Sequence, residues 1–190
     1  MSSSSTQAST TTTPQSVLTF WFDTLNPADW FKKSNELDQQ INNKFANTLQ
    51  QAGRGELVHW RENVQGRLAE IIVLDQFSRN IHRDSAEAFK HDGMALILSQ
   101  ELVAHPDFAT LSQDERNFAL LPMMHSESKQ IHLLARPLFE QFASRPTINF
   151  EQKHFDIIER FGRYPHRNAI LNRTSTNEEI EFLQGPNSGF

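Results

Sequence analysis

The stretch RFGRYPHRN, residues 160–168, places three arginines and a histidine within nine residues of a chain whose formal net charge is −5. Glycine and proline interrupt any helix here, so these polar side chains are held on irregular backbone and can converge. Converging guanidinium groups bind carboxylate or phosphate through paired hydrogen bonds. We therefore predict a site for an anion, with four candidate ligand-binding residues: Arg160, Arg163, Arg167 and Asn168. The alternative is that these arginines bind helix carbonyls and pair with carboxylates of the protein.

A second polar group, His125, Ser126 and Glu127 in MMHSE, follows an apolar run and begins a predicted helix. A helix start offers free N–H groups and partial positive charge to an anion, although Glu127 could itself satisfy that dipole. Histidine transfers protons near neutral pH, so His125, Glu127 and His166 are candidate catalytic residues, and Ser126 is a candidate ligand-binding residue. Two ligands without a third do not make a metal site, so we predict no metal, and any cofactor is unknown.

A third polar group ends the segment LAEIIVLDQFSRN, residues 68–80. Its first half is apolar on nearly every side, which predicts a central helix with little solvent contact. Asp75, Gln76, Arg79 and Asn80 then share one sector of roughly 140° on that helix. They are candidate ligand-binding residues on the floor of a polar pocket. The alternative is a helix end that emerges into water, with Asp75 and Arg79 as an i,i+4 pair.

Helices must position these three groups, because apolar residues recur at three- and four-residue spacing and no strand-like alternation appears. The predicted helices cover residues 34–53, 63–80 and 85–104, then one from the capping box Ser112/Glu115 that Pro122 limits or kinks. Another follows Ser126 as N-cap and is bent by Pro137. The last two run from 149 to 161 and from the candidate capping boxes Ser175/Glu178 and Thr176/Glu179 to Gln184. Short connections favour antiparallel helical hairpins, so we predict an all-α fold.

Composition excludes several classes of function. The chain has 190 residues, 37% of them hydrophobic and 22% charged, which is typical of one globular domain. Mild acidity argues against nucleic-acid binding, and no run approaches the roughly 18 apolar residues of a membrane span. There is no cysteine, which excludes disulfides and thiolate sites. Nothing requires an oxidising compartment, and we expect a cytoplasmic protein of undetermined oligomeric state.

The N-terminal stretch MSSSSTQASTTTTPQ has no apolar core of a signal peptide, and the first basic residue of the chain is Lys32. Serine, threonine and glutamine cannot offset the entropy of ordering, so we predict a disordered tail over residues 1–14. Its removal should leave stability unchanged. Residues 15–190 then form a single helical domain. Within it, the aromatic residues of TFWF and WF near the start are expected to be core.

Several ordered strings resemble a known family: VLTFWF, LDQFSRNIHR, LLPMMHSESKQ, HFDIIERFGRYPHRNAILNR and STNEEIEFLQGPNSGF. Together they are similar to the bacterial-type family catalogued as domain of unknown function 924, over roughly residues 15–190. The resemblance implies an all-helical, tetratricopeptide (TPR)-like superhelix, and no established activity. The three polar groups match the family's pattern. The sequence departs from that pattern with Ser78 in place of proline, Asn172 in place of glycine, Pro137 within a helix, and the added tail.

Two functions from different classes fit these features. In the first, the protein is a small-molecule binder or enzyme whose polar pocket takes an anionic ligand at Arg163 and Arg167, with His125 or His166 transferring protons. In the second, it is a TPR-like adaptor whose arginines capture the C-terminal carboxylate of a peptide. A closed cavity with a histidine near a second polar group would favour the enzyme, and a long open groove would favour the adaptor.

Overall fold

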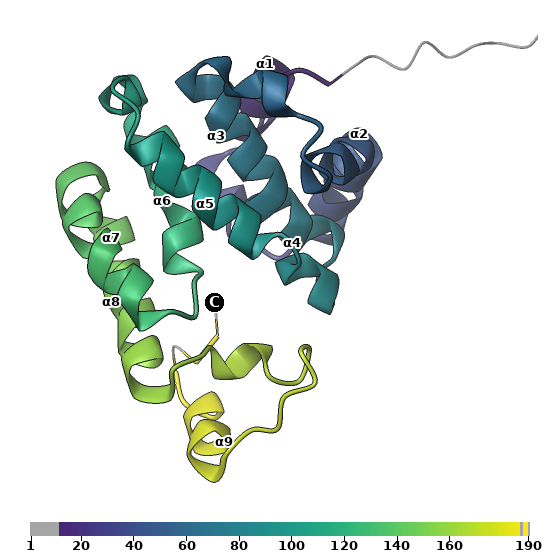
Figure 1. Ribbon diagram of the computed structural model, residues 1–190. Helices are drawn as coiled ribbons and strands as arrows, with labels where there is room; N and C mark the ends of the chain where they lie inside the picture. Colours follow the sequence, from purple (N-terminus) through teal and green to yellow (C-terminus); the bar gives the residue numbers. More distant parts are fainter. Residues whose placement is uncertain (1–11, 187, 190) are drawn as a thin grey trace, which may run out of the picture.

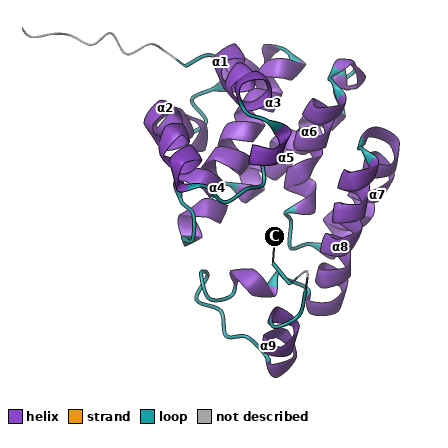
Figure 2. Ribbon diagram, turned by 180° about the vertical axis from the view of Figure 1, so that it is seen from behind, coloured by secondary structure: helices purple, strands orange, loops and turns teal. Residues whose placement is uncertain are grey.

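The computed structural model describes residues 12–186, 188 and 189. Within these residues the regular structure is entirely helical (Figure 2), which confirms the predicted all-α fold. The TPR-like superhelical arrangement remains a prediction. Most of the predicted tail lies outside the described residues. The first helix begins at Pro14, one residue before the predicted boundary, and the Thr13 side chain caps it.

The helices described, in chain order, are α1 (Pro14–Leu18), α2 (Asn35–Gly53), α3 (Val64–Ile72), α4 (Ser78–Ile81), α5 (Asp92–Val103), α6 (Gln113–Met124), α7 (Lys129–Phe142), α8 (Arg145–Phe161) and α9 (Asn177–Leu183) (Figure 1). Two π-helical segments, η1 (Thr19–Thr24) and η4 (Val73–Phe77), extend α1 and α3. Short 3-10 segments occur at η2 (Pro27–Asp29), η3 (Val58–Glu62), η5 (Ala86–Phe89), η6 (Phe108–Thr110) and η7 (Pro165–Arg167).

The continuous run α3–η4–α4 is the central helix of the molecule. It starts at the predicted boundary, where Asn63 is the N-cap and its Oδ1 accepts a hydrogen bond from the Gly66 N–H at 2.9 Å. Every residue from Leu68 to Ser78 is buried, because α3 packs against α1, α5 and α6 while η4 packs against α2. The π-helical turn inside this run was not predicted. It lies where the apolar run ends, at Leu74, and the buried polar residues Asp75 and Gln76 begin.

The predicted boundaries of the middle helices need correction. Residues 85–104 were expected as one helix, but η5 is a separate 3-10 turn and α5 begins at Asp92. The capping box of Ser112 with Glu115 is present as predicted. Pro122 does not stop α6, which continues to Met124, and Pro137 does not interrupt α7.

The later boundaries also differ in part from the prediction. Ser128, rather than Ser126, is the N-cap of α7. Helix α8 begins four residues earlier than expected, at Arg145, with a proline in its first turn, where the missing N–H costs nothing. The capping box of Thr176 with Glu179 opens α9 as predicted.

The N-terminal aromatic residues are core, as expected, with one exception. Phe20 and Trp21 are buried, and the Trp21 ring meets the Phe77 and Phe118 rings edge-on at 5.6 and 5.5 Å between centroids. Phe31 is 74% exposed, although it stacks on Phe118. The aromatic cluster therefore joins the start of the chain to the central helix and to α6.

The chain leaves the helical layers after α8. In Figure 1, α7 and α8 lie side by side, and the segment with α9 crosses the end of the molecule below them. Gly162, with φ of 67°, ends α8 in the left-handed conformation that glycine adopts at low cost. Asn172 also adopts a positive φ, of 54°. Asparagine tolerates this conformation better than most residues, so the turn is kept.

Candidate functional site

The carboxylate of Asp75 is the centre of a polar cluster inside the protein. The π-helical turn η4 buries Asp75 and Gln76 together, with exposed fractions of 1% and 7%. Gln76 Nε2 donates a hydrogen bond to Asp75 Oδ2 at 2.6 Å. Single π-helical turns are rare and occur frequently at functional sites. This polar sector of the helix is thus buried and is not a helix end that emerges into water.

Arg79 connects Asp75 to Asp92, the first residue of α5. Its Nη1 lies 3.0 Å from Asp75 Oδ1, which is the i,i+4 pair that the sequence allowed. Nη1 and Nη2 also donate to the two oxygens of Asp92 at 2.9 and 3.0 Å. Bidentate pairs of this kind are strong and directional. Arg79 therefore occupies both oxygens of the Asp92 carboxylate and holds α4 against α5.

His125 forms the C-cap of α6 and reaches the same carboxylate: Nδ1 lies 2.7 Å from Asp75 Oδ1. Burial alone would raise the pKa of Asp75, but Arg79 and His125 outweigh burial and hold that pKa well below its usual value. Burial lowers the pKa of His125, and Asp75 offsets part of this effect. An ionised carboxylate can only accept hydrogen bonds, so Nδ1 carries the proton and Nε2 of the neutral ring carries a lone pair.

Arg167 enters the cluster from η7 and is 7% exposed. Its guanidinium lies 4.6 Å from the ring centroids of both Phe89 and Tyr164, which is close enough for cation–π attraction. Its contact with a carboxylate is long, at 3.5 Å from Nη1 to Asp92 Oδ2. Nε is buried and has no hydrogen-bond acceptor within the described residues. Burial, and then Arg79, lower the pKa of Arg167, which Asp92 offsets in part.

Glu127 lies in the connection from α6 to α7 and binds the C-terminal segment. Arg173 donates to both of its oxygens, at 2.6 and 2.9 Å, and the Tyr164 N–H donates to Oε1 at 2.8 Å. Burial would raise the pKa of Glu127, but these hydrogen bonds outweigh burial and lower it. The carboxylate is therefore engaged by protein donors. It does not cap the start of α7, where the sequence placed it.

The cluster has equal numbers of carboxylates and arginines, but the arginines are not equally well paired. Three carboxylates (Asp75, Asp92 and Glu127) accompany three arginines (Arg79, Arg167 and Arg173). Arg79 and Arg173 each make paired short bonds, whereas Arg167 has one long contact to a carboxylate that Arg79 already occupies. A buried guanidinium with unfilled donors carries an uncompensated cost of desolvation. Arg167 is thus the least well-paired of these three cations.

His166 was predicted as a catalytic candidate and lies beside the cluster. Its ring centroid is 5.5 Å from that of Tyr164, on which Arg167 also packs. Burial, and then Arg167, lower the pKa of His166 to about 4. The imidazole is therefore neutral at physiological pH.

The other arginines and Asn168 from RFGRYPHRN do not join the cluster. Arg163 donates to both oxygens of Glu179, at 2.6 and 2.8 Å, and Asn168 donates to the same carboxylate at 3.3 Å. Arg160 pairs with Glu178 at the surface. These contacts fasten α9 to the end of α8. The three arginines of the stretch therefore do not converge: Arg167 turns inward, and Arg160 and Arg163 hold helices together.

Two further predicted residues make other contacts. Asn80 Nδ2 donates to Asp38 Oδ1 at 2.8 Å, and Asp38 belongs to α2. Ser126 Oγ accepts a hydrogen bond from the Ser128 N–H at 3.2 Å, so it stabilises the turn before α7.

Sequence reasoning missed four residues of the cluster: Phe89, Asp92, Tyr164 and Arg173. Arg173 and Tyr164 stand in the family-like string that ends in ILNR, so a signal existed for both. Tyr164 is the sole tyrosine of the chain and is fully buried. Asp92 gave no signal, because an acidic residue in the first turn of a helix is ordinary.

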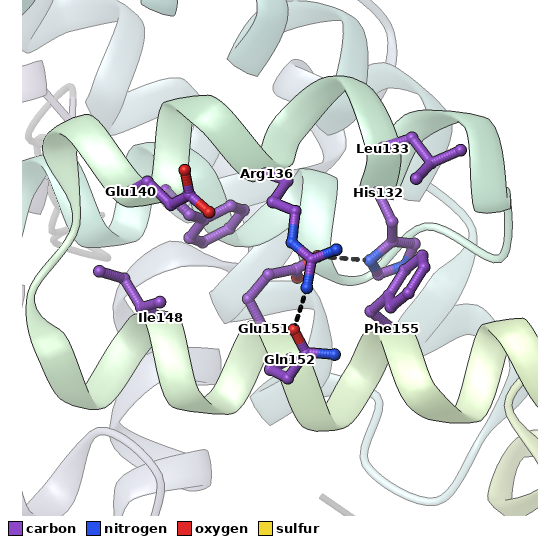
Figure 3. Close-up of a pocket in the computed structure, with 9 residues that line it drawn as sticks. His132, Leu133, Arg136, Glu140, Ile148, Glu151, Gln152 and Phe155 are labelled. Atoms are coloured by element: carbon purple, nitrogen blue, oxygen red, sulfur yellow. Dashed lines mark hydrogen bonds and ion pairs between the residues drawn. The ribbon is translucent and has the colours of Figure 1, made fainter.

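A polar cavity lies between α7 and α8. It has a volume of about 70 Å³, which is room for a few water molecules. Figure 3 shows His132 and Glu151 facing each other beneath Arg136, whose guanidinium donates to Gln152. Nδ1 of His132 lies 2.7 Å from Glu151 Oε1, and its Nε2 lies 3.3 Å from the hydroxyl of Tyr164. This second polar pair was also missed, and Tyr164 connects it to the main cluster.

No group of three or more histidine, aspartate or glutamate side chains in the described part of the chain is arranged to hold a metal ion. Across the same residues, none of the helices combines the length and the apolar character that a bilayer crossing requires.

The fold and the cluster define a class of protein: a small all-helical domain with carboxylates, arginines and a histidine networked in its interior. The sequence model of the family described as bacterial protein of unknown function (DUF924) matches residues 17–187. The chain belongs to this family, which confirms the resemblance seen in its sequence.

A solved structure supports the same assignment. The protein of unknown function ATU0120 from Agrobacterium tumefaciens is 33% identical to this chain, with a TM-score of 0.85. The match covers 90% of this chain and 97% of that one. No curated protein gives a significant match.

Proposed function

We propose that this protein binds a small ligand with a carboxylate or phosphate group, and that Arg167 receives that group. The observation that carries the proposal is the incomplete pairing of Arg167. Its side chain is buried, with 7% of the residue exposed, and its Nε has no acceptor within the described residues. A ligand anion would supply the acceptors that the protein does not. The flanking rings of Phe89 and Tyr164 fix the plane of the guanidinium, which suits bidentate recognition.

Thermal unfolding in the presence of anions tests this proposal. Phosphate and succinate, added at constant ionic strength with chloride as reference, should raise the melting temperature of the wild type. An anion at ten times its dissociation constant stabilises the native state by about 1.4 kcal/mol. For a domain of this size, that corresponds to roughly 3–6 °C.

Arg167→Met should abolish the response to the anion, because methionine keeps the packing volume but removes the donors. Arg160→Met is the matched control, since it removes an arginine of the same stretch that pairs with Glu178 at the surface. The control should respond as the wild type does. Equal responses of wild type and Arg167→Met would contradict the proposal.

The adaptor function remains a second candidate, because a peptide C-terminus presents the same carboxylate. The observation in its favour is the exposure of large apolar side chains on α7 and α8: Leu134 is 59% and Phe150 is 48% exposed. Binding of a peptide with a free C-terminus, together with loss of binding on amidation, would support the adaptor. A cytoplasmic location is part of both proposals, and cell fractionation tests it.

A further inference from the structure

Asp75 and His125 are arranged like a general-base dyad, in which a carboxylate orients a histidine. Asp75 is 1% exposed and accepts hydrogen bonds from His125 Nδ1 and from Gln76 Nε2, at 2.7 and 2.6 Å. A buried carboxylate that holds one ring nitrogen fixes the tautomer and orientation of the imidazole. The other nitrogen, Nε2, makes no hydrogen bond to the described residues, and the His125 side chain is 16% exposed.

The dyad and the proposed anion site belong to one network. Asp75 Oδ1 contacts His125 and Arg79, Arg79 contacts Asp92, and Asp92 contacts Arg167. A second connection passes through Tyr164. Arg167 packs on the ring of Tyr164, whose hydroxyl donates to the carbonyl of Met124, the residue before His125.

We propose that His125 is a catalytic general base, positioned by Asp75, that removes a proton from water or from an acidic O–H of the anion held at Arg167. This inference rests on the proposed function and extends it, because the anionic ligand becomes a substrate. The substrate class is a small acid that carries, besides its anionic group, an ester-like carbonyl open to attack by water or an acidic O–H. Asp75 stays ionised and serves as a positioning residue.

An activated ester is a suitable probe of the proposed base. In its hydrolysis, His125 Nε2 takes a proton from water while the water oxygen forms a bond to the acyl carbon. The bond from that carbon to the aryl oxygen then breaks, p-nitrophenolate leaves, and the histidine returns its proton to solvent. The carboxylic acid formed loses the second proton of the water to solvent, so the products are a carboxylate and p-nitrophenolate, and no oxidant or cofactor is needed.

The experiment compares two p-nitrophenyl esters of equal chain length, the mono-ester of adipic acid and the neutral ester of hexanoic acid. The wild type should hydrolyse the adipate ester faster than the hexanoate ester, and more slowly in D₂O than in H₂O. His125→Gln should lower the rate on the adipate ester about a hundredfold or more, in line with the usual contribution of a general base. Arg167→Met should remove the preference for the adipate ester.

Controls separate this inference from the proposed function. His59→Gln changes an exposed histidine and should hydrolyse both esters as the wild type does. His125→Gln should keep its rise in melting temperature with phosphate, which shows that it folds and binds. The wild type could show a rise in melting temperature with phosphate but no hydrolysis that depends on His125. That result would leave the proposed function standing and would contradict the role of His125 as a general base.

Two further results would overturn the inference. Equal rates in H₂O and D₂O would indicate direct attack by Nε2 in place of proton abstraction. Nitrogen-15 NMR of the wild-type histidines should show His125 protonated at Nδ1, and Asp75→Asn should change this tautomer population. A wild-type His125 protonated at Nε2 would contradict the proposed role. This measurement uses the wild-type protein, so it does not depend on the folding of a variant.

Discussion

Arg163 and Arg167 stand four residues apart, and the structure gives them opposite environments. Arg163 Nε donates to Glu179 at 2.6 Å, whereas Arg167 Nε is buried without an acceptor among the described residues. The sequence identified both cations, but it could not distinguish them. Glu179 and Asp92 come from opposite directions along the chain, and their distances to the arginines depend on how η7 folds back. The anion site therefore rests on Arg167 alone of the arginines in this stretch.

At the same scale, His154 should make stability depend on pH. It is 6% exposed, and burial lowers its pKa to about 3, although the hydrogen bond to the Phe150 carbonyl opposes this shift. The folded state therefore resists protonation, while the unfolded chain binds a proton below about pH 6.5. The stabilising effect is present above pH 6.5 and is lost as the pH falls towards 3. Between pH 6.5 and 5 the loss is about 2 kcal/mol.

Urea unfolding at several pH values, followed by tryptophan fluorescence, checks this prediction. His154→Gln should lose less unfolding free energy on acidification than the wild type loses. His59→Gln, at the surface, should follow the wild type. If His154→Gln and the wild type lose stability in parallel, the pH dependence arises from other groups.

At the scale of elements, the central helix shows what a hydrophobic pattern can and cannot predict. The apolar residues within Leu68–Leu74 correctly predicted a buried helix, and the side chains after them were correctly assigned to a polar sector. The π-helical turn could not be predicted. A helix that is apolar on nearly every side has no hydrophobic periodicity in which a change of helical pitch would be visible. The hydrogen bond from Gln76 to Asp75 lies within that turn, so a detail of the site was missed with it.

Leu74→Ala in this helix should lower the unfolding free energy by about 2–5 kcal/mol, because Leu74 is fully buried and its truncation leaves a cavity. Leu134→Ala in α7 is the control. Leu134 is 59% exposed, so the change should stay within about 0.5 kcal/mol. Denaturant unfolding measures both, and a loss of less than about 1 kcal/mol for Leu74→Ala would show that the core lies elsewhere.

At the scale of the whole molecule, the all-helical fold followed from periodicity and from the family resemblance, but the closure of the polar cluster did not. The C-terminal segment completes that cluster by contributing Tyr164, Arg167 and Arg173 to a site that begins at Asp75. Such long-range contacts carry no local signal in a single sequence. The path of this segment was the least predictable part of the fold, and the proposed anion site depends on it.

Arg173 should hold this segment in place through its two bonds to Glu127. Arg173→Met should therefore speed amide hydrogen exchange in η7 and the following residues by about tenfold, a change of 1.4 kcal/mol in the local opening free energy. Lys129→Met removes an exposed ion pair with Glu159 and should not change this exchange. Unchanged exchange in Arg173→Met would mean that the apolar contacts of Tyr164 anchor the segment by themselves.

We expect the Nε–H of Arg167 to donate to a ligand anion, and NMR of the arginine side chains observes that group directly. A titration of the nitrogen-15-labelled protein with succinate should shift the Nε–Hε signal of Arg167 and slow its exchange with water. The signal of Arg163, already bonded to Glu179, should stay in place. Arg167→Lys assigns the peak by removing it. An Arg167 signal that does not move when succinate has raised the melting temperature to its limit would contradict the account, since the anion would then bind elsewhere.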